Sequence, residues 1–371
     1  MTSALFTPIQ FRDLLLANRI MVSPMCQYSA KNGSATRWHE VHLGHLALGG
    51  AGMLCVEATA VEAAGRITPG CLGLYSEENE DALRRVVDTV RGVSPIKLAL
   101  QIGHAGRKGS SEVPWRGGQL IATDQGGWKP FAPSALPHHQ DEAPPQALDI
   151  PGIERIKEAF AATATRAARL GFDALELHCA HGYLLHEFLS PIANRREDQF
   201  GGSLDNRMRF PLEVFDAIRA VWPADKPLGV RVSATDWVAG GWEIEQCLAF
   251  SRQLANRNCD WIDCSSGGIS PEQVIPLEPG YQVPFAKRIH TETGVPTIAV
   301  GLITDPQQAE SIIANGDADI VALARAMLYD PRWPWHAAAA LGATVHAPEQ
   351  YWRCPPRGIG RIFGDTPIGA R

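Results

Sequence analysis

The sequence predicts a (β/α)₈ barrel, and three observations lead to this fold class. From Arg19 onward, strand-like and helix-like segments alternate with short breaks, and eight segments qualify as strands. Repeated strand-then-helix units indicate a parallel sheet, and eight of them indicate a closed barrel. Several strands are apolar at successive positions, which is typical of strands buried on both faces. The length of 371 residues suits a barrel with insertions, and a doubly wound open sheet is the alternative fold.

The predicted strands are short apolar runs bounded by breaks in the pattern. They cover residues 20–23, 53–61, 96–102, 173–178, 228–233, 261–265, 297–300 and 320–324. The segments between them are amphipathic at helical spacing. They predict helices over residues 38–48, 78–93, 153–170, 206–221, 243–258, 284–293 and 306–315. A last helix is expected to start near Arg325 and to run through Ala337 to Leu341.

Residues 1–371 are expected to form a single domain with one long excursion and a tail. The excursion covers residues 103–151, between the third strand and its helix, and it contains Trp115 and Trp128. A loop of this size in a compact domain is usually functional, so we predict an ordered cap that shapes the substrate site. The tail, residues 342–371, is expected to form an interface with another subunit.

Composition excludes several classes of protein. The chain is 45% hydrophobic and 20% charged, as in a globular protein, and its net charge of -6 without a dense Lys/Arg block argues against nucleic acid as a partner. No apolar stretch is long enough to span a membrane, and the N-terminus lacks a basic region followed by an apolar core. We therefore expect a cytoplasmic protein whose eight cysteines are reduced thiols; none of them forms a C-x-x-C pair.

The segment from Phe172 to Tyr183 is the strongest candidate for a functional site. A short buried strand ends there at His178, and His181 and Tyr183 follow within five residues. Loops after the strands of parallel α/β folds carry the chemistry. Three interpretations remain open at this point: structural histidines, two ligands of a metal ion, or a pair that binds a substrate oxygen with Tyr183 as an acid.

The remaining alternatives use other residues. A zinc hydrolase would need further ligands beside His178 and His181, such as His39, His42 or His45, but that trio lies in a helical stretch without obvious carboxylate support. A Schiff-base lyase would use Lys108, although Arg107 beside it indicates a solvated basic segment. A non-catalytic binding barrel is the last alternative. We predict no metal site.

The ends of the last two strands predict a phosphate site. In many barrels the loops after strands seven and eight bind phosphate through backbone N–H groups. Gly301 lets the backbone approach a ligand closely, and Arg325 offers a guanidinium suited to bidentate phosphate contact. A dinucleotide-binding Rossmann fingerprint is absent, so NAD(P)H is expected to bind transiently.

Several motifs resemble the Old Yellow Enzyme family of flavin-dependent ene-reductases, which are (β/α)₈ barrels. Cys26, Tyr28 and the C-terminal Gln350-Tyr351-Trp352-Arg353 resemble its bacterial thermophilic-like subclass. Two features depart from the family pattern: Ala324 replaces a glycine, and the excursion and the tail exceed the compact subclass. The motifs are Ser23-Pro24-Met25-Cys26-Gln27-Tyr28, Glu57-Ala58-Thr59-Ala60-Val61, residues 101–108, residues 178–191 and Gly201-Gly202-Ser203-Leu204-Asp205-Asn206-Arg207.

The resemblance implies FMN as a tightly bound, non-covalent cofactor. Arg231 would face the N1/O2 edge of its ring system, and Cys26 would lie near the O4/N5 edge and tune the redox potential. Other residues would hold the isoalloxazine ring or the phosphate. The ring would be held by Ser23, Pro24, Met25, Cys26, Ala60 and Gln101, and the phosphate by Gly301, Ala324 and Arg325.

The resemblance also implies a reaction. NADPH would reduce FMN, and flavin N5 would then deliver hydride to the β-carbon of an activated alkene. His178 and His181, assisted by Tyr28, would bind the substrate carbonyl, and Tyr183 would protonate the α-carbon. Arg353 would reach into the active site of a neighbouring subunit.

A homo-oligomer is expected for a second reason. Trp333-Pro334-Trp335 and Tyr351-Trp352 would expose a large aromatic surface on a monomer, and such surfaces usually mark an interface.

Overall fold

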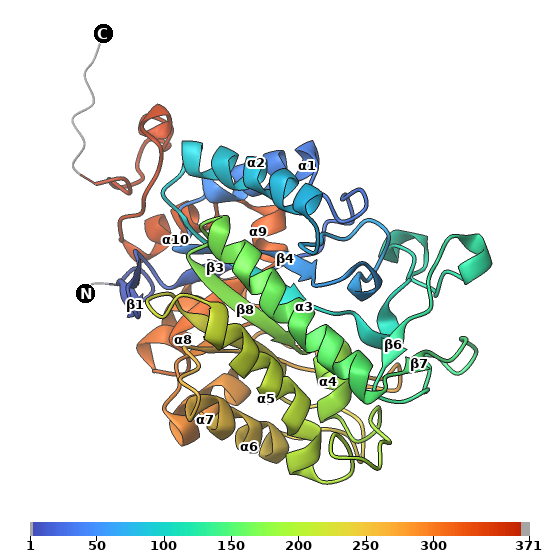
Figure 1. The fold of residues 1–371 in the computed structure, drawn as a ribbon. Coiled ribbons are helices and arrows are strands. Elements are labelled where there is room, and N and C mark those ends of the chain that lie inside the picture. Colours follow the sequence, from blue (N-terminus) through green and yellow to red (C-terminus); the bar gives the residue numbers. More distant parts are fainter. Residues whose placement is uncertain (1–2, 365–371) are drawn as a thin grey trace.

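The computed structural model describes residues 3–364 and contains a closed barrel of eight parallel strands (Figure 1). The strand order around the barrel is β10-β11-β12-β3-β4-β5-β8-β9. This confirms the predicted (β/α)₈ fold and excludes the open sheet. The strands are β3 (Ile20–Val22), β4 (Met53–Ala60), β5 (Lys97–Gly103), β8 (Ala174–Cys179), β9 (Leu228–Ser233), β10 (Ile262–Ser265), β11 (Thr297–Ala299) and β12 (Ile320–Leu323).

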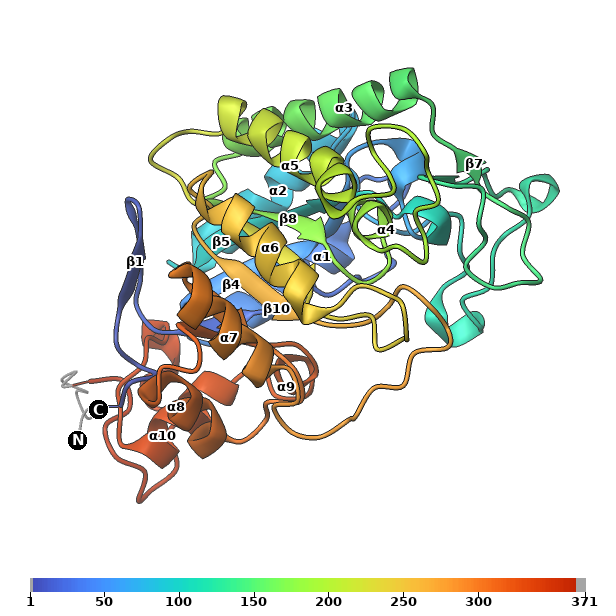
Figure 2. The same ribbon diagram turned by 90° about the horizontal axis from the view of Figure 1, so that it is seen from below.

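Helices surround this barrel (Figures 1 and 2). Most begin and end close to their predicted positions: α1 (Arg37–Ala47), α2 (Glu77–Val93), α3 (Ile150–Arg169), α5 (Leu204–Val221), α6 (Ile244–Ala255), α7 (Val283–Thr293) and α8 (Pro306–Ala314). The single last helix was a wrong prediction, because the structure has two, α9 (Arg325–Tyr329) and α10 (Trp333–Leu341). Pro331 lies between them; it has no backbone N–H to donate and disfavours helical backbone at the residue before it.

Several short elements were not predicted. The hairpin of β1 (Ile9–Phe11) and β2 (Leu14–Leu16) packs against apolar side chains of the barrel strands, among them Trp261. Helix α4 (Leu184–Leu189) follows β8, and β6 (Phe131–Ala132) pairs with β7 (Gln146–Ala147) inside the excursion. Short 3₁₀ turns are η1 (Ala63–Gly65), η2 (Gly106–Lys108), η3 (Pro114–Arg116), η4 (Thr123–Gln125) and η5 (Glu349–Tyr351).

The excursion is an ordered cap, as predicted. Trp128 anchors it through a hydrogen bond of 3.0 Å from its indole N–H to the Ala64 carbonyl. Arg196 donates a second bond, of 3.0 Å, to the carbonyl of Pro133. Trp115 remains 69% exposed, with its ring 5.5 Å from that of Tyr28. Trp128 therefore ties the cap to the loop after β4, whereas Trp115 is exposed and packs edge to face against Tyr28.

The tail contradicts the expected aromatic surface. Trp333 and Trp335 are each only 6% exposed. The ring centroid of Trp335, in α10, lies 5.8 Å from that of Tyr351 and 5.1 Å from that of Phe363. The tail therefore folds back over α10. An exposed tryptophan surface therefore cannot serve as an argument for an interface.

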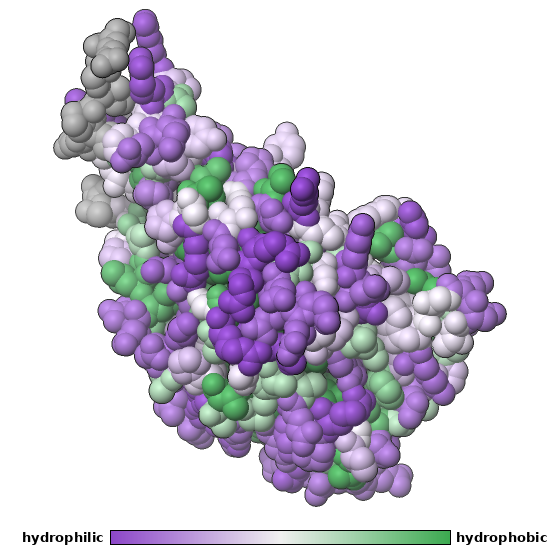
Figure 3. Space-filling model, turned by 45° about the horizontal axis from the view of Figure 1, so that its top comes forward, coloured by the Kyte–Doolittle hydropathy of each residue, from purple (hydrophilic) through white to green (hydrophobic). Residues whose placement is uncertain are grey.

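The outer surface is consistent with the composition. On the face drawn in Figure 3, hydrophilic residues form a broad central area and apolar residues are scattered. Within residues 3–364, none of the helices combines the length and apolar character needed to cross a bilayer.

One contact inside the barrel gives a stability prediction. Gly229 in β9 faces the indole of the fully buried Trp261, and a Cβ atom at Gly229 would lie 2.1 Å from that indole. Because Trp261 fills the barrel interior, it has no room to move away. We expect Gly229→Ala to lower the free energy of unfolding by about 1–3 kcal/mol. Urea denaturation measures this change.

Gly44 in α1 provides the matched control, because no neighbouring atom lies within 4 Å of the position that a methyl group would take there. Gly44→Ala is therefore expected to stabilise the protein by about 0.5–1 kcal/mol through the helix propensity of alanine. If Gly229→Ala and Gly44→Ala changed the free energy of unfolding equally, the Trp261 indole would have moved to make room for the new methyl group.

Candidate active site

Three aromatic rings converge just beyond the end of β8. The ring centroid of His178 lies 5.1 Å from that of His181 and 5.1 Å from that of Tyr183, with both pairs edge to face. His178 belongs to the strand, whereas His181 and Tyr183 come from the turn that leads into α4. The structure therefore brings together the three residues that the sequence analysis placed at one strand end.

The electrostatic environment keeps all three groups neutral. Burial, together with the charge of Arg231, lowers the pKa values of His178 and His181 well below the ordinary 6.5. Burial raises the pKa of the Tyr183 hydroxyl well above 10.0. The site thus contains two neutral imidazoles and a protonated phenol near neutral pH.

Hydrogen bonds distinguish the two histidines. Nδ1 of His178 accepts the backbone N–H of Ala180 at 3.3 Å, so the ring proton is on Nε2. Nε2 of His181 lies 2.7 Å from the hydroxyl of Ser265. His178 can therefore donate to a ligand without losing a protein contact, whereas His181 must share or exchange its Ser265 contact.

Three residues expected around the flavin come from three strands of the barrel that do not pair with one another. Ser23 follows β3, Gln101 lies in β5 and Arg231 lies in β9, and all three are buried. The Ser23 hydroxyl is buried without a hydrogen-bond partner among the described residues. An unpaired buried hydroxyl and a buried cation at one rim fit a polar ring system such as isoalloxazine.

Two carboxylates beneath Arg231 were missed by the sequence analysis. Oδ2 of Asp263 lies 3.1 Å from Nε of Arg231, and Glu176 accepts bonds from Gln101 at 2.9 Å and from Trp261 at 3.2 Å. Burial, and then the charge of Asp263, raise the pKa of Glu176 to about 7. The sequence did contain a signal for them, because Glu176 and Asp263 are acidic residues inside the apolar runs of β8 and β10.

Cys26 has a partner that was also missed. The Cys26 side chain is hydrogen-bonded to Cys71, and this bond and burial raise the pKa of Cys26 well above 9.0. The same bond lowers the pKa of Cys71, which also accepts the backbone N–H of Thr68 at 3.4 Å. Cys26 is therefore a protonated thiol, which agrees with a modulating rather than a nucleophilic role.

The residues expected at the phosphate lie on two paired strands. Gly301 follows β11 with φ of +122°, and a Cβ atom there would lie 2.8 Å from the side-chain nitrogen of Gln282. Ala324 follows β12, which pairs with β11, and Arg325 is the exposed first residue of α9. The predicted set is thus contiguous, and position 301 requires glycine.

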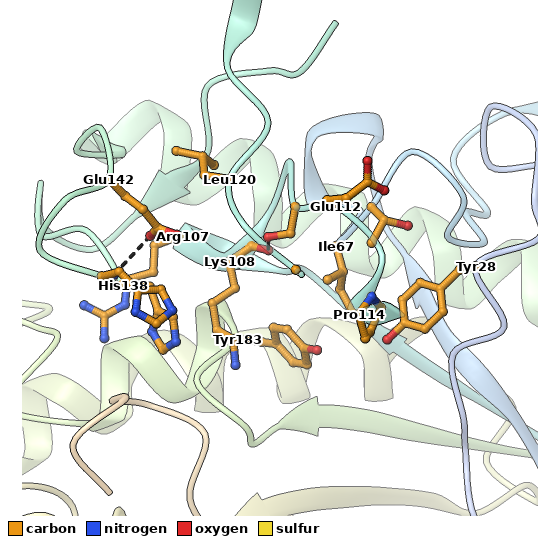
Figure 4. A pocket seen from close by; sticks show the side chains of 14 residues that line it. Tyr28, Ile67, Arg107, Lys108, Glu112, Pro114, Leu120, His138, Glu142 and Tyr183 are labelled. Carbon is orange, nitrogen blue, oxygen red and sulfur yellow. Dashed lines mark hydrogen bonds between the residues drawn. The ribbon is translucent and has the colours of Figure 1, made fainter. Parts of the chain in front are cut away.

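Residues of the cap line a cavity of about 210 Å³ beside Tyr183, whereas His178 and His181 are not among the residues that line it (Figure 4). Tyr28 and Tyr183 line it together with Arg107, Lys108 and His138. Lys108 donates to the carbonyls of His181 at 2.9 Å and Gly268 at 3.0 Å, with Nζ 5.1 Å from the Tyr183 ring centroid.

The expectation of a solvated basic segment at Arg107 and Lys108 is wrong. Burial lowers the pKa of Lys108 to about 8. Arg107 is only 8% exposed and donates to the carbonyl of Ile269 at 2.6 Å. Arg107 and Lys108 therefore join the start of the cap to the loops after β8 and β10 through hydrogen bonds to backbone carbonyls.

Nothing supports the metal-hydrolase alternative. Among the described residues, no group of three or more His, Cys, Asp or Glu side chains is arranged to hold a metal ion. Contrary to the prediction, His39 does have a carboxylate beside it, because its Nε2 lies 3.3 Å from Oε1 of Glu57. Its Nδ1 accepts the backbone N–H of Thr36 at 3.0 Å, so both ring nitrogens serve the structure at the start of α1.

Arg353 is the one predicted site residue that lies apart from the others. It is exposed on the tail. Figures 1 and 2 both place the red part of the chain after α10 on the opposite side of the molecule from the cap around β6 and β7.

A parallel barrel with neutral donors and a buried arginine near the ends of its strands fits a flavin-dependent oxidoreductase. Comparison with known proteins identifies the family. Residues 4–343 match the "NADH:flavin oxidoreductase / NADH oxidase family". The chain belongs to this family, which includes the Old Yellow Enzymes, and the predicted FMN-dependent oxidoreductase is confirmed.

Relatives cover almost the whole chain. An NADPH dehydrogenase of Geobacillus thermodenitrificans is 43% identical over 95% of this chain and 99% of its own length. An NADPH dehydrogenase of Bacillus subtilis is 40% identical with the same coverage. Among solved structures, morphinone reductase superimposes with a TM-score of 0.74 at 28% identity, over 94% of this chain and 92% of its own.

Proposed function

We propose that this chain is an FMN-dependent NADPH:ene-reductase that reduces small α,β-unsaturated carbonyl compounds. The convergence of His178, His181 and Tyr183 as three neutral donors carries the proposal. Reduction of an activated alkene needs donors on the carbonyl oxygen and a proton for the α-carbon, and the site contains both.

The chain's own residues bind and protonate the substrate. When bound, FMN supplies a hydride that it has received from NADPH. Nε2–H of His178, with His181 beside it, donates to the substrate oxygen and stabilises the negative charge that develops there. The Tyr183 hydroxyl, which burial keeps protonated, gives its proton to the α-carbon. Tyr28 and residues of the cap line the cavity beside Tyr183.

The cofactor residues are proposed on their positions at the strand ends. Arg231 would stabilise negative charge at the N1/O2 edge, and Cys26 would contact the O4/N5 edge through a protonated thiol. The ring would further contact Ser23, Pro24, Met25, Ala60 and Gln101. The phosphate would be held by Gly301, Ala324 and Arg325.

Spectroscopy under anaerobic conditions tests the function. The purified protein is expected to show a flavin spectrum that bleaches with NADPH and returns when 2-cyclohexenone is added. A preparation that does not take up FMN would contradict the flavin assignment. Bleaching by NADPH, followed by recovery with a quinone but not with any enone, would leave an NADPH dehydrogenase and remove the ene-reductase.

We further propose a homo-oligomer in which Arg353 completes the active site of a neighbouring subunit. Arg353 is exposed, and its segment lies on the far side of the molecule from its own cap, so it can serve a site only in another copy (Figure 2). A two-fold dimer would place two such arginines reciprocally.

Loss of Arg353 is expected to be rescued between subunits. Arg353→Ala removes a charge-assisted contact, which is expected to lower kcat/KM by about 10-fold. When Arg353→Ala is mixed with Tyr183→Phe under conditions of subunit exchange, hybrid dimers contain one site with both residues intact, and activity should rise above the sum of the parents. No gain despite exchange shown by native mass spectrometry would make Arg353 a surface residue, as would full activity of Arg353→Ala alone.

A further inference from the structure

The turn that carries His181 and Tyr183 has an unfavourable backbone conformation. His181 has φ of +59° and Gly182 has φ of +72°. A left-handed conformation at a residue with a side chain is unfavourable and persists only when the surroundings enforce it. A Cβ atom at Gly182 would lie 2.1 Å from the carbonyl oxygen of Gly268, so the turn is also closely packed.

Side chains from three other elements hold the polar groups of this turn. The backbone N–H of His181 donates to Ser233 at 2.9 Å, and its carbonyl accepts from Lys108 at 2.9 Å. The N–H of Gly182 donates to Nδ1 of His186 in α4, also at 2.9 Å. Lys108 and His186 thus hold the two polar groups of one peptide, the one that joins His181 to Gly182.

His186 also lies against a buried carboxylate, at ion-pair distance. Since its Nδ1 accepts a hydrogen bond, its ring proton is on Nε2, which lies 2.9 Å from Oδ1 of Asp236. Both side chains are completely buried. Oδ2 of Asp236 accepts the Ser190 hydroxyl at 2.6 Å and the backbone N–H of Trp242 at 2.7 Å, so the carboxylate cannot turn.

We propose that His186 and Asp236 are positioning residues for the active site, and this inference rests on the proposed function of Tyr183 and His181. Asp236 selects the tautomer of His186, and His186 then holds the Gly182 peptide, which sets the direction of the two neighbouring rings. Both side chains are completely buried, so neither can contact a substrate. Their effect therefore reaches the substrate only through the turn.

Two substitutions of His186 separate its two contacts. In His186→Asn, the amide oxygen occupies the place of Nδ1 and can accept the Gly182 N–H, but the link to Asp236 is lost. In His186→Gln, the amide can reach Asp236, but the Gly182 N–H loses its acceptor. We expect His186→Gln to slow flavin reoxidation by 2-cyclohexenone roughly 10-fold, and His186→Asn to stay within about 3-fold of wild type. Flavin reduction by NADPH should be unchanged in both.

Asp236→Asn tests the tautomer with almost no change of shape. The new amide nitrogen would face Nε2 of His186 and disfavour a proton there. The ring proton would then move to Nδ1, where it would point at the Gly182 N–H and break that hydrogen bond. Asp236→Asn is therefore expected to reproduce the slow reoxidation of His186→Gln, and it provides the test if His186→Gln does not fold.

Asn194→Ala is the control for a loss of buried hydrogen bonds in the same region. Asn194 lies after α4 and donates to the carbonyls of Phe188 at 2.8 Å and Phe200 at 2.7 Å. Its loss should lower Tm while reoxidation remains at the wild-type rate.

The outcomes separate this inference from the proposed function. If reoxidation falls in step with Tm across all four variants, or if His186→Gln and Asp236→Asn both react like wild type, then the pair is only structural. If the wild type itself is not reoxidised by any enone, the proposed function fails. The positioning role is then read from p-hydroxybenzaldehyde binding, followed by the flavin spectrum, which must weaken in His186→Gln and Asp236→Asn but not in Asn194→Ala.

Discussion

Tyr183→Phe is expected to slow the reoxidation of reduced flavin by enones by about 100-fold or more, while flavin reduction by NADPH keeps its rate. Only the alkene step needs a proton at this position. The hydroxyl is buried, and the raised pKa keeps it protonated, so the wild-type rate should not fall between pH 6 and 9 through ionisation of Tyr183. Anaerobic stopped-flow spectroscopy measures the two half-reactions separately.

Two neighbouring groups, Lys108 and Tyr28, bear on whether another acid can replace Tyr183. Lys108 lies over the face of the ring, and its ammonium group donates to two carbonyl oxygens. Tyr28 lines the same cavity, and burial raises the pKa of its hydroxyl as well. Unchanged enone reoxidation in Tyr183→Phe would assign the proton to another donor, and the double variant with Tyr28→Phe would show whether Tyr28 supplies it.

The barrel was predictable because each of its strands is an apolar run between clear breaks. Predicted and observed strands differ by at most one residue at each end, as at β4 and β10. Elements too short to show a helical or strand periodicity of apolar residues were not predicted. Helix α4 has six residues, all buried, so it shows no amphipathic alternation, and the strands of the β1–β2 hairpin have three residues each.

The site was predictable where chemistry and sequence position coincide. His178, His181 and Tyr183 lie within six residues of one another, so one strand end brings them together. Cys71, Glu176, Asp263 and His186 each contact at least one residue far away in the sequence, and no local pattern identifies those distant partners. The buried tryptophans of α10 show the same limit, because only the fold of the tail reveals that they are covered.

His178→Ala is expected to lower kcat/KM for enones by about 100-fold to 1000-fold and to weaken the binding of phenolic ligands, with FMN content unchanged. The reason is the free Nε2–H of His178, which is fixed by the hydrogen bond from Ala180 to Nδ1. His181→Ala should cost less, since Nε2 of His181 already contacts Ser265 and must exchange that contact for the substrate. Steady-state kinetics and titration with p-hydroxybenzaldehyde measure both effects.

His290→Ala is the matched control, because His290 lies at the end of α7 with a contact of 3.1 Å to Asp319, outside the cavity. Its kinetics should equal those of the wild type. Because burial lowers the pKa of His178, the imidazole is neutral above pH 6, and ligand binding should not depend on its titration between pH 6 and 8. An equal or larger loss in His181→Ala would reverse the assignment of the main donor. If stoichiometric zinc restored activity to a metal-free preparation, His178 and His181 would be metal ligands and not donors to the substrate oxygen.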